Sequence, residues 1–202
     1  VEQLQVDAAI IFADILLILD AMGLELRFAK NHGPVFDNPV KKPEDVNAIP
    51  EINVRDSLGY VGEAIKLCFS ELESTPLIGF AGAPFTVASY AIEGSGSKTF
   101  SKVKTFMHQH PEAFYKLMDK LRIATEEYLK MQVEAGASCV QLFDSWVGCL
   151  SPHDYQKFVL PHMIKLFDTI CNVAPTIHFG TDTATLLPFM AQTKASVIGV
   201  DW

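Results

Sequence analysis

Three apolar runs in the chain each lead into side chains that can do chemistry. The first run ends at Asp14, the second continues through Gly82 to Tyr90, and the third ends in Asp144 and Ser145. Carboxylates, phenols and hydroxyls bind polar ligands and take part in acid–base chemistry. The carboxyl ends of parallel strands meet at one edge of a sheet. We therefore predict that Asp14, Tyr90 and Ser145 face one pocket.

The elements that position these residues are predicted from hydrophobic patterns. Apolar runs that alternate with long amphipathic segments are typical of buried parallel strands. Strands are expected at 9–13, 77–81, 139–143, 175–179 and 197–201. Helices are expected at 15–22, 43–49, 57–72, 84–93, 111–135, 152–171 and 183–192. Residues 31–42 are expected to form a loop, because Gly33, Pro34 and Pro39 interrupt any periodicity.

Five strands separated by helices indicate an α/β fold, either a (β/α) barrel or an open doubly wound sheet. A complete (β/α)8 barrel needs about 250 residues, and this chain has 202. The chain begins at Val1 rather than at a methionine and closes on Trp202 at the end of a strand-like run. We therefore expect a segment excised from a longer protein.

Composition excludes several classes of protein. The apolar fraction of 49% and the charged fraction of 20% are typical of a globular domain. The net charge of −8 argues against nucleic acid or an anionic membrane as a partner. No uncharged apolar run approaches 18 residues, and no basic leader opens the chain, so neither a membrane span nor a signal peptide is expected. The four cysteines form no C-x-x-C pair, which favours reduced thiols in a cytoplasmic protein.

Each candidate residue also has a purely structural interpretation. Asp14 could be the N-cap of the following helix, and Gly82 could serve a tight strand-to-helix turn instead of close approach to a ligand. Ser145 lacks a G-x-S-x-G motif, so a serine hydrolase is weakly supported. His178 ends a strand, but position 180 is glycine and not a second ligand. A lone histidine of this kind is more often structural than metal-binding.

Taken together, these segments resemble the uroporphyrinogen decarboxylase family. The stretches that carry the resemblance are IIFADIL at 10–16, GPVFDNPV at 33–40, LGYVGEAI at 58–65, PLIGFAGAPFTVASYAIEG at 76–94, QLFDSWVG at 141–148 and IGVDW at 198–202. GFAGAPFT followed by a tyrosine is highly specific, whereas IIFADIL and FDSW are each moderately so. The resemblance extends from one end of the chain to the other.

The resemblance implies a (β/α)8 TIM barrel of which this chain supplies about five strands, with residues 1–202 as the central portion of a single domain. It also implies a homodimer that removes carbon dioxide from the four acetate side chains of uroporphyrinogen III, without metal or organic cofactor, to give coproporphyrinogen III. By motif, Asp14 matches the aspartate that gathers the pyrrole N–H groups. The residues that match the substrate-binding set are Tyr90, Ser145, Ile10, Phe80, Gly82 and Phe143.

Chemistry agrees with this assignment and also shows a gap. A pyrrole protonated at a ring carbon can accept the electrons that decarboxylation leaves, and a fixed carboxylate stabilises the resulting cation. The substrate carries eight carboxylates, so arginines should be prominent. The chain has only Arg27, Arg55 and Arg122. In the family, an arginine-bearing segment precedes the first matched motif and a histidine-bearing segment follows the last, and both lie outside this sequence.

Two other functions remain open. Zinc-dependent corrinoid methyltransferases share the fold, but they typically use an H-x-C ligand pair where this chain has His178 and Gly180. A non-catalytic tetrapyrrole-binding protein would need an apolar pocket, but not Asp14, Tyr90 and Ser145 together. Bound zinc would favour the first alternative, and porphyrinogen binding without turnover would favour the second.

Overall fold

The computed structural model describes residues 1, 3–29, 33–72 and 74–202. Within these residues, five strands form one parallel sheet in the order β1-β4-β5-β6-β7, which confirms the α/β prediction. The strands of this sheet are β1 (Ala9–Ile10), β4 (Leu77–Gly82), β5 (Cys139–Asp144), β6 (Thr176–Gly180) and β7 (Val197–Gly199). The order follows the chain, as in consecutive strands of a (β/α) barrel.

Helices follow the strands and cover one face of the sheet. Their bounds are α1 (Leu17–Ala21), α2 (Pro43–Ala48), α3 (Val54–Glu71), α4 (Pro84–Glu93), α5 (Ser101–Gln109), α6 (Pro111–Glu134), α7 (Pro152–Asp154), α8 (Leu160–Ile170) and α9 (Leu187–Met190). Short 3-10 turns lie at η1 (Val147–Cys149) and η3 (Ala191–Thr193), and a π-helical turn, η2 (Tyr155–Val159), precedes α8. No helix in the described ranges is long and apolar enough to cross a membrane.

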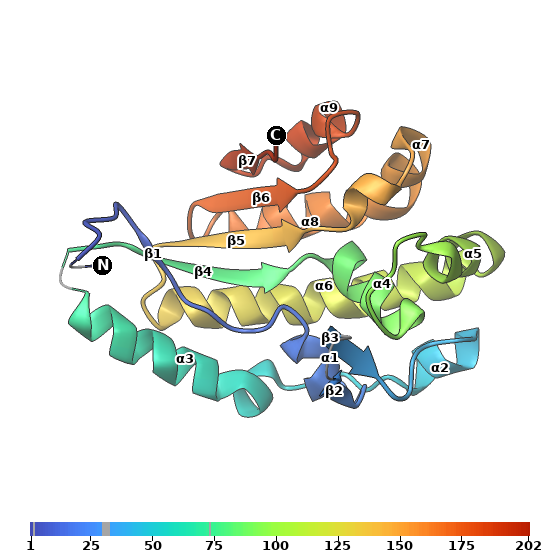
Figure 1. Cartoon of the computed structure of the whole chain (residues 1–202), viewed down its shortest axis with the longest axis horizontal. Helices are drawn as coiled ribbons and strands as arrows, with labels where there is room; N and C mark the ends of the chain where they lie inside the picture. The colour runs from blue at the N-terminus through green and yellow to red at the C-terminus, as the bar shows by residue number, and fades with distance from the viewer. Residues whose placement is uncertain (2, 30–32, 73) are drawn as a thin grey trace.

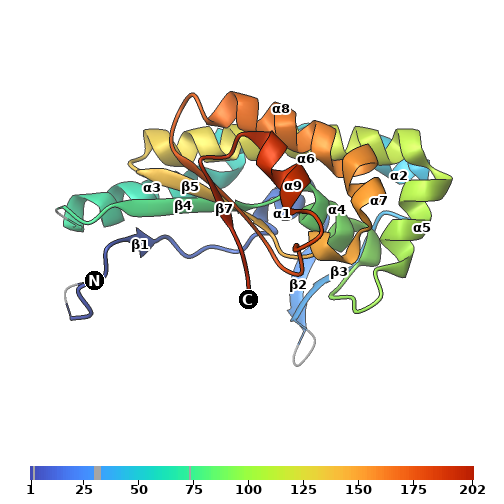
Figure 2. The ribbon, with the colours of Figure 1, turned by 90° about the horizontal axis from the view of Figure 1, so that it is seen from above.

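The arrangement of layers explains the hydrophobic patterns. Figure 2 shows α3, α6 and α8 on one face of the sheet, and α6 contacts both α3 and α8 as well as β4 and β5. In β5 and β6, alternate residues are buried toward this helical layer, and the others are half-buried on the opposite face. That second face corresponds to the interior of a barrel. Figure 1 shows β4, β5 and β6 pointing toward the end of the molecule where α4, α5 and α7 lie.

The predicted loop at 31–42 was wrong over residues 33–36. Residues 31 and 32 lie outside the described residues, but β3 (Gly33–Phe36) pairs antiparallel with β2 (Leu26–Ala29) in a separate two-stranded sheet. Pro34 is tolerated because a strand with only one such partner can lack a backbone N–H on its other edge. The Phe36 N–H donates to Gly94 O at 2.8 Å, which fixes the hairpin against the end of α4.

The ends of several other strands and helices differ from the prediction, because the hydrophobic pattern of the sequence is weak there. The first strand comprises Ala9–Ile10 alone, and the helix expected at 183–192 is regular only over Leu187–Met190. Helix α5 (Ser101–Gln109) was not predicted. Its predecessor Phe100 has a left-handed backbone with φ 54°, and the Ser97 hydroxyl accepts a hydrogen bond from the Phe100 N–H at 3.0 Å.

A glutamine on α6 completes the hydrogen bonding of β4 where β1 has ended. Gln132 is fully buried, its Oε1 accepts from the Phe80 N–H at 2.8 Å, and its Nε2 donates to Phe80 O at 2.8 Å. Gly79 is required beside it, because a Cβ there would lie 2.6 Å from Gln132 Oε1. A single side chain thus satisfies both backbone groups of Phe80, which buried backbone requires.

Replacing Gln132 with leucine should therefore destabilise the complete protein. Gln132→Leu leaves the buried N–H and C=O of Phe80 without partners, and an unsatisfied buried group costs about 1–3 kcal/mol. The matched control is Gln109→Leu, because Gln109 is exposed on α5 and such surface changes usually stay within about 0.5 kcal/mol. Urea unfolding measures both. Equal stabilities would show that Gln132 does not support β4.

Candidate functional site

Tyr90 is brought to the end of β5 by helix α4. Pro84 occupies the first turn of α4, which suits its fixed backbone, and nearly every residue of the helix is buried. The Tyr90 ring stacks on the Trp146 ring with centroids 3.7 Å apart. Phe100 meets the same indole edge-on at 5.1 Å. Trp146 thus joins Tyr90 to the segment that carries Ser145.

Thr86 fixes that segment to α4. Its hydroxyl donates to Asp144 Oδ1 at 2.9 Å and accepts from the Trp146 N–H at 3.1 Å, and Thr86 and Asp144 are fully buried. The Thr181 hydroxyl donates to Ser145 O from the next strand end. The backbone of residues 144–146 is therefore held from both sides, while the half-buried Ser145 side chain remains at the surface of the site.

Asp14 lies near Tyr90, and one of its carboxylate oxygens accepts a hydrogen bond from the backbone two residues further on. Its Oδ1 accepts a hydrogen bond from the Leu16 N–H at 2.8 Å, so the capping interpretation is correct for one oxygen. The second oxygen accepts no hydrogen bond from the described residues. Burial raises the pKa of Tyr90, and the neighbouring Asp14 carboxylate raises it further. The Tyr90 phenol is therefore a neutral hydrogen-bonding group near neutral pH.

The interior face of the sheet presents an apolar surface beside these groups. Phe80, Phe143 and Phe179 lie on three adjacent strands, with edge-to-face contacts at 5.5 Å and 5.7 Å between ring centroids. Ile10 is 49% exposed and Phe12 is 93% exposed on the first strand and just beyond it. Three predicted lining residues, Ile10, Phe80 and Phe143, thus occur on strands of one sheet. A flat hydrophobic ligand would bury such a surface favourably.

Gly82 has a packing role in the fold. A Cβ at this position would lie 2.7 Å from Val87 Cγ2 and 2.9 Å from Ile15 O. The space beside Gly82 is therefore filled by the segment that follows Asp14. This agrees with the tight-turn interpretation, and contact between Gly82 and a ligand stays a prediction.

A cluster of buried polar groups lies behind the site, toward the helices. Asp144 Oδ2 and His178 Nε2 are 3.8 Å apart, and both side chains are fully buried. The His178 ring packs against Phe167 of α8 with centroids 5.1 Å apart. Burial raises the pKa of Tyr155, and the Asp144 carboxylate raises it further. His178 therefore faces the helical layer and not the interior face.

In the described ranges, no group of three His, Cys, Asp or Glu side chains is placed to hold a metal ion. The H-x-C pair of the zinc alternative is also sterically blocked. A Cβ at Gly180 would lie 2.7 Å from Thr183 Cγ2 and 3.2 Å from Asp144 O. A cysteine at position 180 would therefore require the surrounding residues to move.

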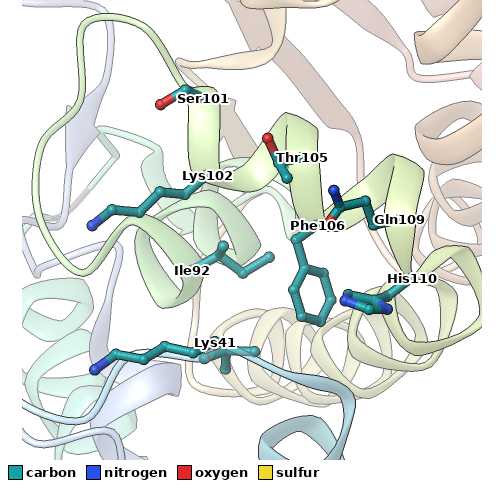
Figure 3. Close-up of a pocket in the computed structure, with 9 residues that line it drawn as sticks. Lys41, Ile92, Ser101, Lys102, Thr105, Phe106, Gln109 and His110 are labelled. Carbon is teal, nitrogen blue, oxygen red and sulfur yellow. The ribbon is translucent and has the colours of Figure 1, made fainter.

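A hollow of about 340 Å³ lies between α4, α5 and residues 40–41. Figure 3 shows Ile92 and Phe106 at its centre, with Lys41 and Lys102 extending on the same side. None of its described lining residues lies at the end of a strand of the five-stranded sheet. We therefore place the candidate site at the strand ends and not in this hollow.

Sequence reasoning missed three residues that shape the site, namely Thr86, Phe100 and Trp146. Trp146 stood beside Ser145 in the FDSW motif, and Thr86 stood in GFAGAPFT, so both lay within the segments that carried the resemblance. Their contacts join residues 60 and 46 positions apart in the chain, which no local pattern can predict.

The fold and the site together define a parallel α/β protein of the barrel type, with its polar side chains gathered at the carboxyl ends of the strands. The chain belongs to the uroporphyrinogen decarboxylase (URO-D) family, whose model matches residues 1–202.

Similar proteins support this assignment. The chain is 50% identical to uroporphyrinogen decarboxylase of Carboxydothermus hydrogenoformans, and the match covers 100% of this chain and 58% of that protein. The proteins of the same name from Chloroflexus aurantiacus and Koribacter versatilis are 47% and 48% identical, with the same coverage. The chain thus spans 58% of the length of these curated relatives.

A solved structure supports the fold. A methyltransferase from Methanosarcina mazei superimposes with a TM-score of 0.77 over 95% of this chain and 57% of that chain. The sequence identity is 19%, so this similarity concerns the fold alone.

Removing the Thr86 hydroxyl should loosen the site. Thr86→Val keeps the shape of the side chain but leaves Asp144 Oδ1 and the Trp146 N–H without their partner, at a cost of about 1–3 kcal/mol. Thr86→Ser keeps the hydroxyl and serves as the matched control. Urea unfolding and the tryptophan fluorescence of the complete protein should change for the valine variant only. A valine variant that matched the wild type would show that this link is dispensable.

Proposed function

We propose that the complete protein decarboxylates the four acetate side chains of uroporphyrinogen III, giving coproporphyrinogen III. Membership of the family supports this proposal, as do relatives that carry the name uroporphyrinogen decarboxylase. The observation that carries it is the gathering of Asp14, Tyr90 and Ser145 at one edge of a sheet whose interior face is lined by phenyl rings.

The geometry suits a tetrapyrrole. The macrocycle is apolar on its faces and donates four pyrrole N–H groups toward its centre. The phenyl surface of Phe80, Phe143 and Phe179 would bury one face. The Asp14 oxygen that accepts no hydrogen bond from the described residues would accept from the pyrrole N–H groups. Tyr90 and Ser145 would hold polar groups at the rim.

The proposed mechanism uses the substrate as its own electron acceptor. Protonation of a pyrrole at the ring carbon next to the one that bears the acetate gives a cation. The carbon–carboxylate bond then breaks, and its electron pair forms an exocyclic double bond to the ring, which neutralises the cation and releases carbon dioxide. A proton then adds to the exocyclic methylene carbon, and the protonated ring carbon releases its proton, which restores the aromatic pyrrole. A fixed carboxylate near the ring nitrogens lowers the energy of the cation as it forms. Asp14 would supply that charge, and its bond from the Leu16 N–H would keep it oriented.

The same proposal extends to the domain organisation, the oligomeric state and the cellular location. We propose that residues 1–202 form the central portion of a single (β/α)8 barrel domain, because five consecutive parallel strands are present in the described ranges. We also propose a homodimer, which the resemblance implies and light scattering of the complete protein would test. A cytoplasmic location is the third, and cell fractionation would test it.

Activity of the complete protein should survive removal of metal ions. Gly180 leaves no room for the cysteine of a zinc-binding pair, and His178 faces the helical layer. Dialysis against EDTA should therefore leave the rate of decarboxylation of uroporphyrinogen III unchanged. Loss of activity that zinc alone restored would contradict the proposal and favour the zinc alternative.

Asp14→Asn in the complete protein should remove most of the turnover. Asparagine keeps an acceptor oxygen for the Leu16 N–H, so the turn is retained, but the negative charge is lost. Loss of one preorganised electrostatic contact lowers the rate by about 10²–10³-fold. Asp14→Glu should also be impaired, because an extra methylene displaces the carboxylate by about 1 Å.

The control for this experiment is Asp56→Asn, because Asp56 is an exposed aspartate in the first turn of α3 and outside the predicted site. Turnover and the thermal midpoint are measured for every variant. Near-normal turnover by the Asp14→Asn variant would show that Asp14 is only a cap. A variant protein that bound the porphyrinogen normally but did not turn it over would support the proposed electrostatic role.

A further inference from the structure

The carboxylates of the proposed substrate need cationic partners, and the arginines of this chain are already paired. Arg27 lies 2.7 Å from an oxygen of Asp37, and Arg55 lies 2.7 Å from an oxygen of Glu134. Arg122 bonds Glu126 at 2.5 Å on α6. The pair of Arg27 and Asp37 lies in the connection between β1 and α3, and the other two pairs lie on α3 and α6. Because the three arginines already have carboxylate partners within the chain, lysines and histidines are the next cations to consider.

A hollow of about 550 Å³ adjoins the candidate site and contains two such lysines. Three segments line it, namely the residues before and within α5, the end of β5 with η1, and the end of β6. The lining residues include Lys98, Lys104, Ser145, Trp146 and Asp182. Ser145 and Trp146 belong to both the hollow and the candidate site. The hollow is therefore an extension of that site.

Contacts of the surrounding backbone fix the segments that line the hollow. The Phe100 ring rests on Trp146, and the Ser97 hydroxyl accepts from the Phe100 N–H, so the loop that carries Lys98 is anchored at its end. Gly148 allows η1 to approach the neighbouring strand end, because a Cβ there would lie 2.2 Å from Thr181 O. Lys98 and Lys104 therefore lie on segments whose positions are fixed by these contacts.

Both lysines lack a carboxylate partner among the described residues, in contrast to Lys66, which lies 2.7 Å from Glu63. Lys98 is exposed and Lys104 is half-buried. Burial raises the pKa of the Cys149 thiol to about 11, and the nearby Lys104 ammonium opposes that rise. Asp182 is the acidic side chain of the lining, and it forms no ion pair with either lysine in the described structure.

We propose that Lys98 and Lys104, together with the Ser145 hydroxyl, form a binding site for a carboxylate side chain of the tetrapyrrole. This inference rests on the proposed function and extends it to residues outside the predicted set. Two ammonium groups and a hydroxyl can hold one carboxylate through charge-assisted hydrogen bonds. A macrocycle lying on the phenyl surface would project its rim substituents toward the strand ends, where this site opens.

The test compares four variants of the complete protein, namely Lys98→Ala, Lys104→Met, the double variant and the double arginine variant. Methionine keeps the apolar stem of the half-buried Lys104, so packing is retained. Lys66→Ala on α3 is the matched control. The affinity for uroporphyrin III, the stable oxidised octacarboxylate, is measured by fluorescence titration at low and high salt. KM and kcat are measured with uroporphyrinogen III.

Each single variant should weaken uroporphyrin binding by about fivefold and the double variant by about 20-fold, with a parallel rise in KM and a smaller change in kcat. The arginine variant should recover most of the affinity, because it restores both charges. The difference between the double variant and the wild type should shrink in high salt, since exposed charges are screened. Repeating the titration with coproporphyrin III identifies the carboxylate, because only a propionate site affects both ligands.

A double variant whose affinity and KM stayed within twofold of the wild type would overturn the inference. Failure of the proposed function would look different, because the wild type would then bind uroporphyrin without converting uroporphyrinogen. The binding titration still tests the lysines in that case. The thermal midpoint of each variant identifies any loss of affinity that results from unfolding, and the arginine variant then decides whether charge is responsible.

Discussion

The side chain of Thr86 joins helix α4 to the end of strand β5, and the geometry of the candidate site depends on that link. One hydroxyl serves the Asp144 carboxylate and the Trp146 N–H at once. Because Trp146 in turn stacks on Tyr90 and meets Phe100, a single buried contact sets the position of side chains from three segments. A buried hydroxyl that satisfies two partners is costly to replace, which gives the site its rigidity.

The alternation of strand residues divides the chemistry between two faces. On the interior face, β4, β5 and β6 present phenyl rings, which suit the apolar face of a ligand. On the helical face, the same strands carry Asp144 and His178, which are fully buried and 3.8 Å apart. At the strand ends, both the phenyl rings and the pair of Asp144 and His178 come near Ser145. The buried acid and imidazole therefore face the helical layer and not the interior face.

Much of the architecture could be predicted from the sequence. Long apolar runs gave four of the five sheet strands to within about two residues at either end, because parallel strands buried on both faces read as continuous hydrophobic segments. Pro84 and Pro111 marked two helix starts correctly. The hairpin at 33–36 was missed because glycine and proline are also typical of turns, and its pairing depends on contacts with the distant Gly94.

The candidate site was predictable only in part. Asp14 and Ser145 were expected at strand ends and Tyr90 on the helix that follows β4. In the structure Tyr90 stacks on Trp146, the neighbour of Ser145, and the Asp14 carboxylate lies near the Tyr90 phenol. Binding of one ligand by all three stays a prediction. The side chains that fix them could not be found from spacing, because their contacts cross between elements far apart in the chain. Gln132 shows the same limit, since its role on β4 depends on where β1 ends. Local sequence patterns predict helices and strands, but the packing of helices against strands decides which polar groups form hydrogen bonds with one another.

The central claim is that Asp14 faces the pyrrole nitrogens of a tetrapyrrole lying on the phenyl surface. A crystal structure of the complete protein with coproporphyrinogen III bound tests it most directly. The account predicts at least two pyrrole nitrogens within about 3.2 Å of the Asp14 carboxylate, the ordinary limit of an N–H···O hydrogen bond. A macrocycle bound in the hollow between α4 and α5, with Asp14 free of contact, would contradict it.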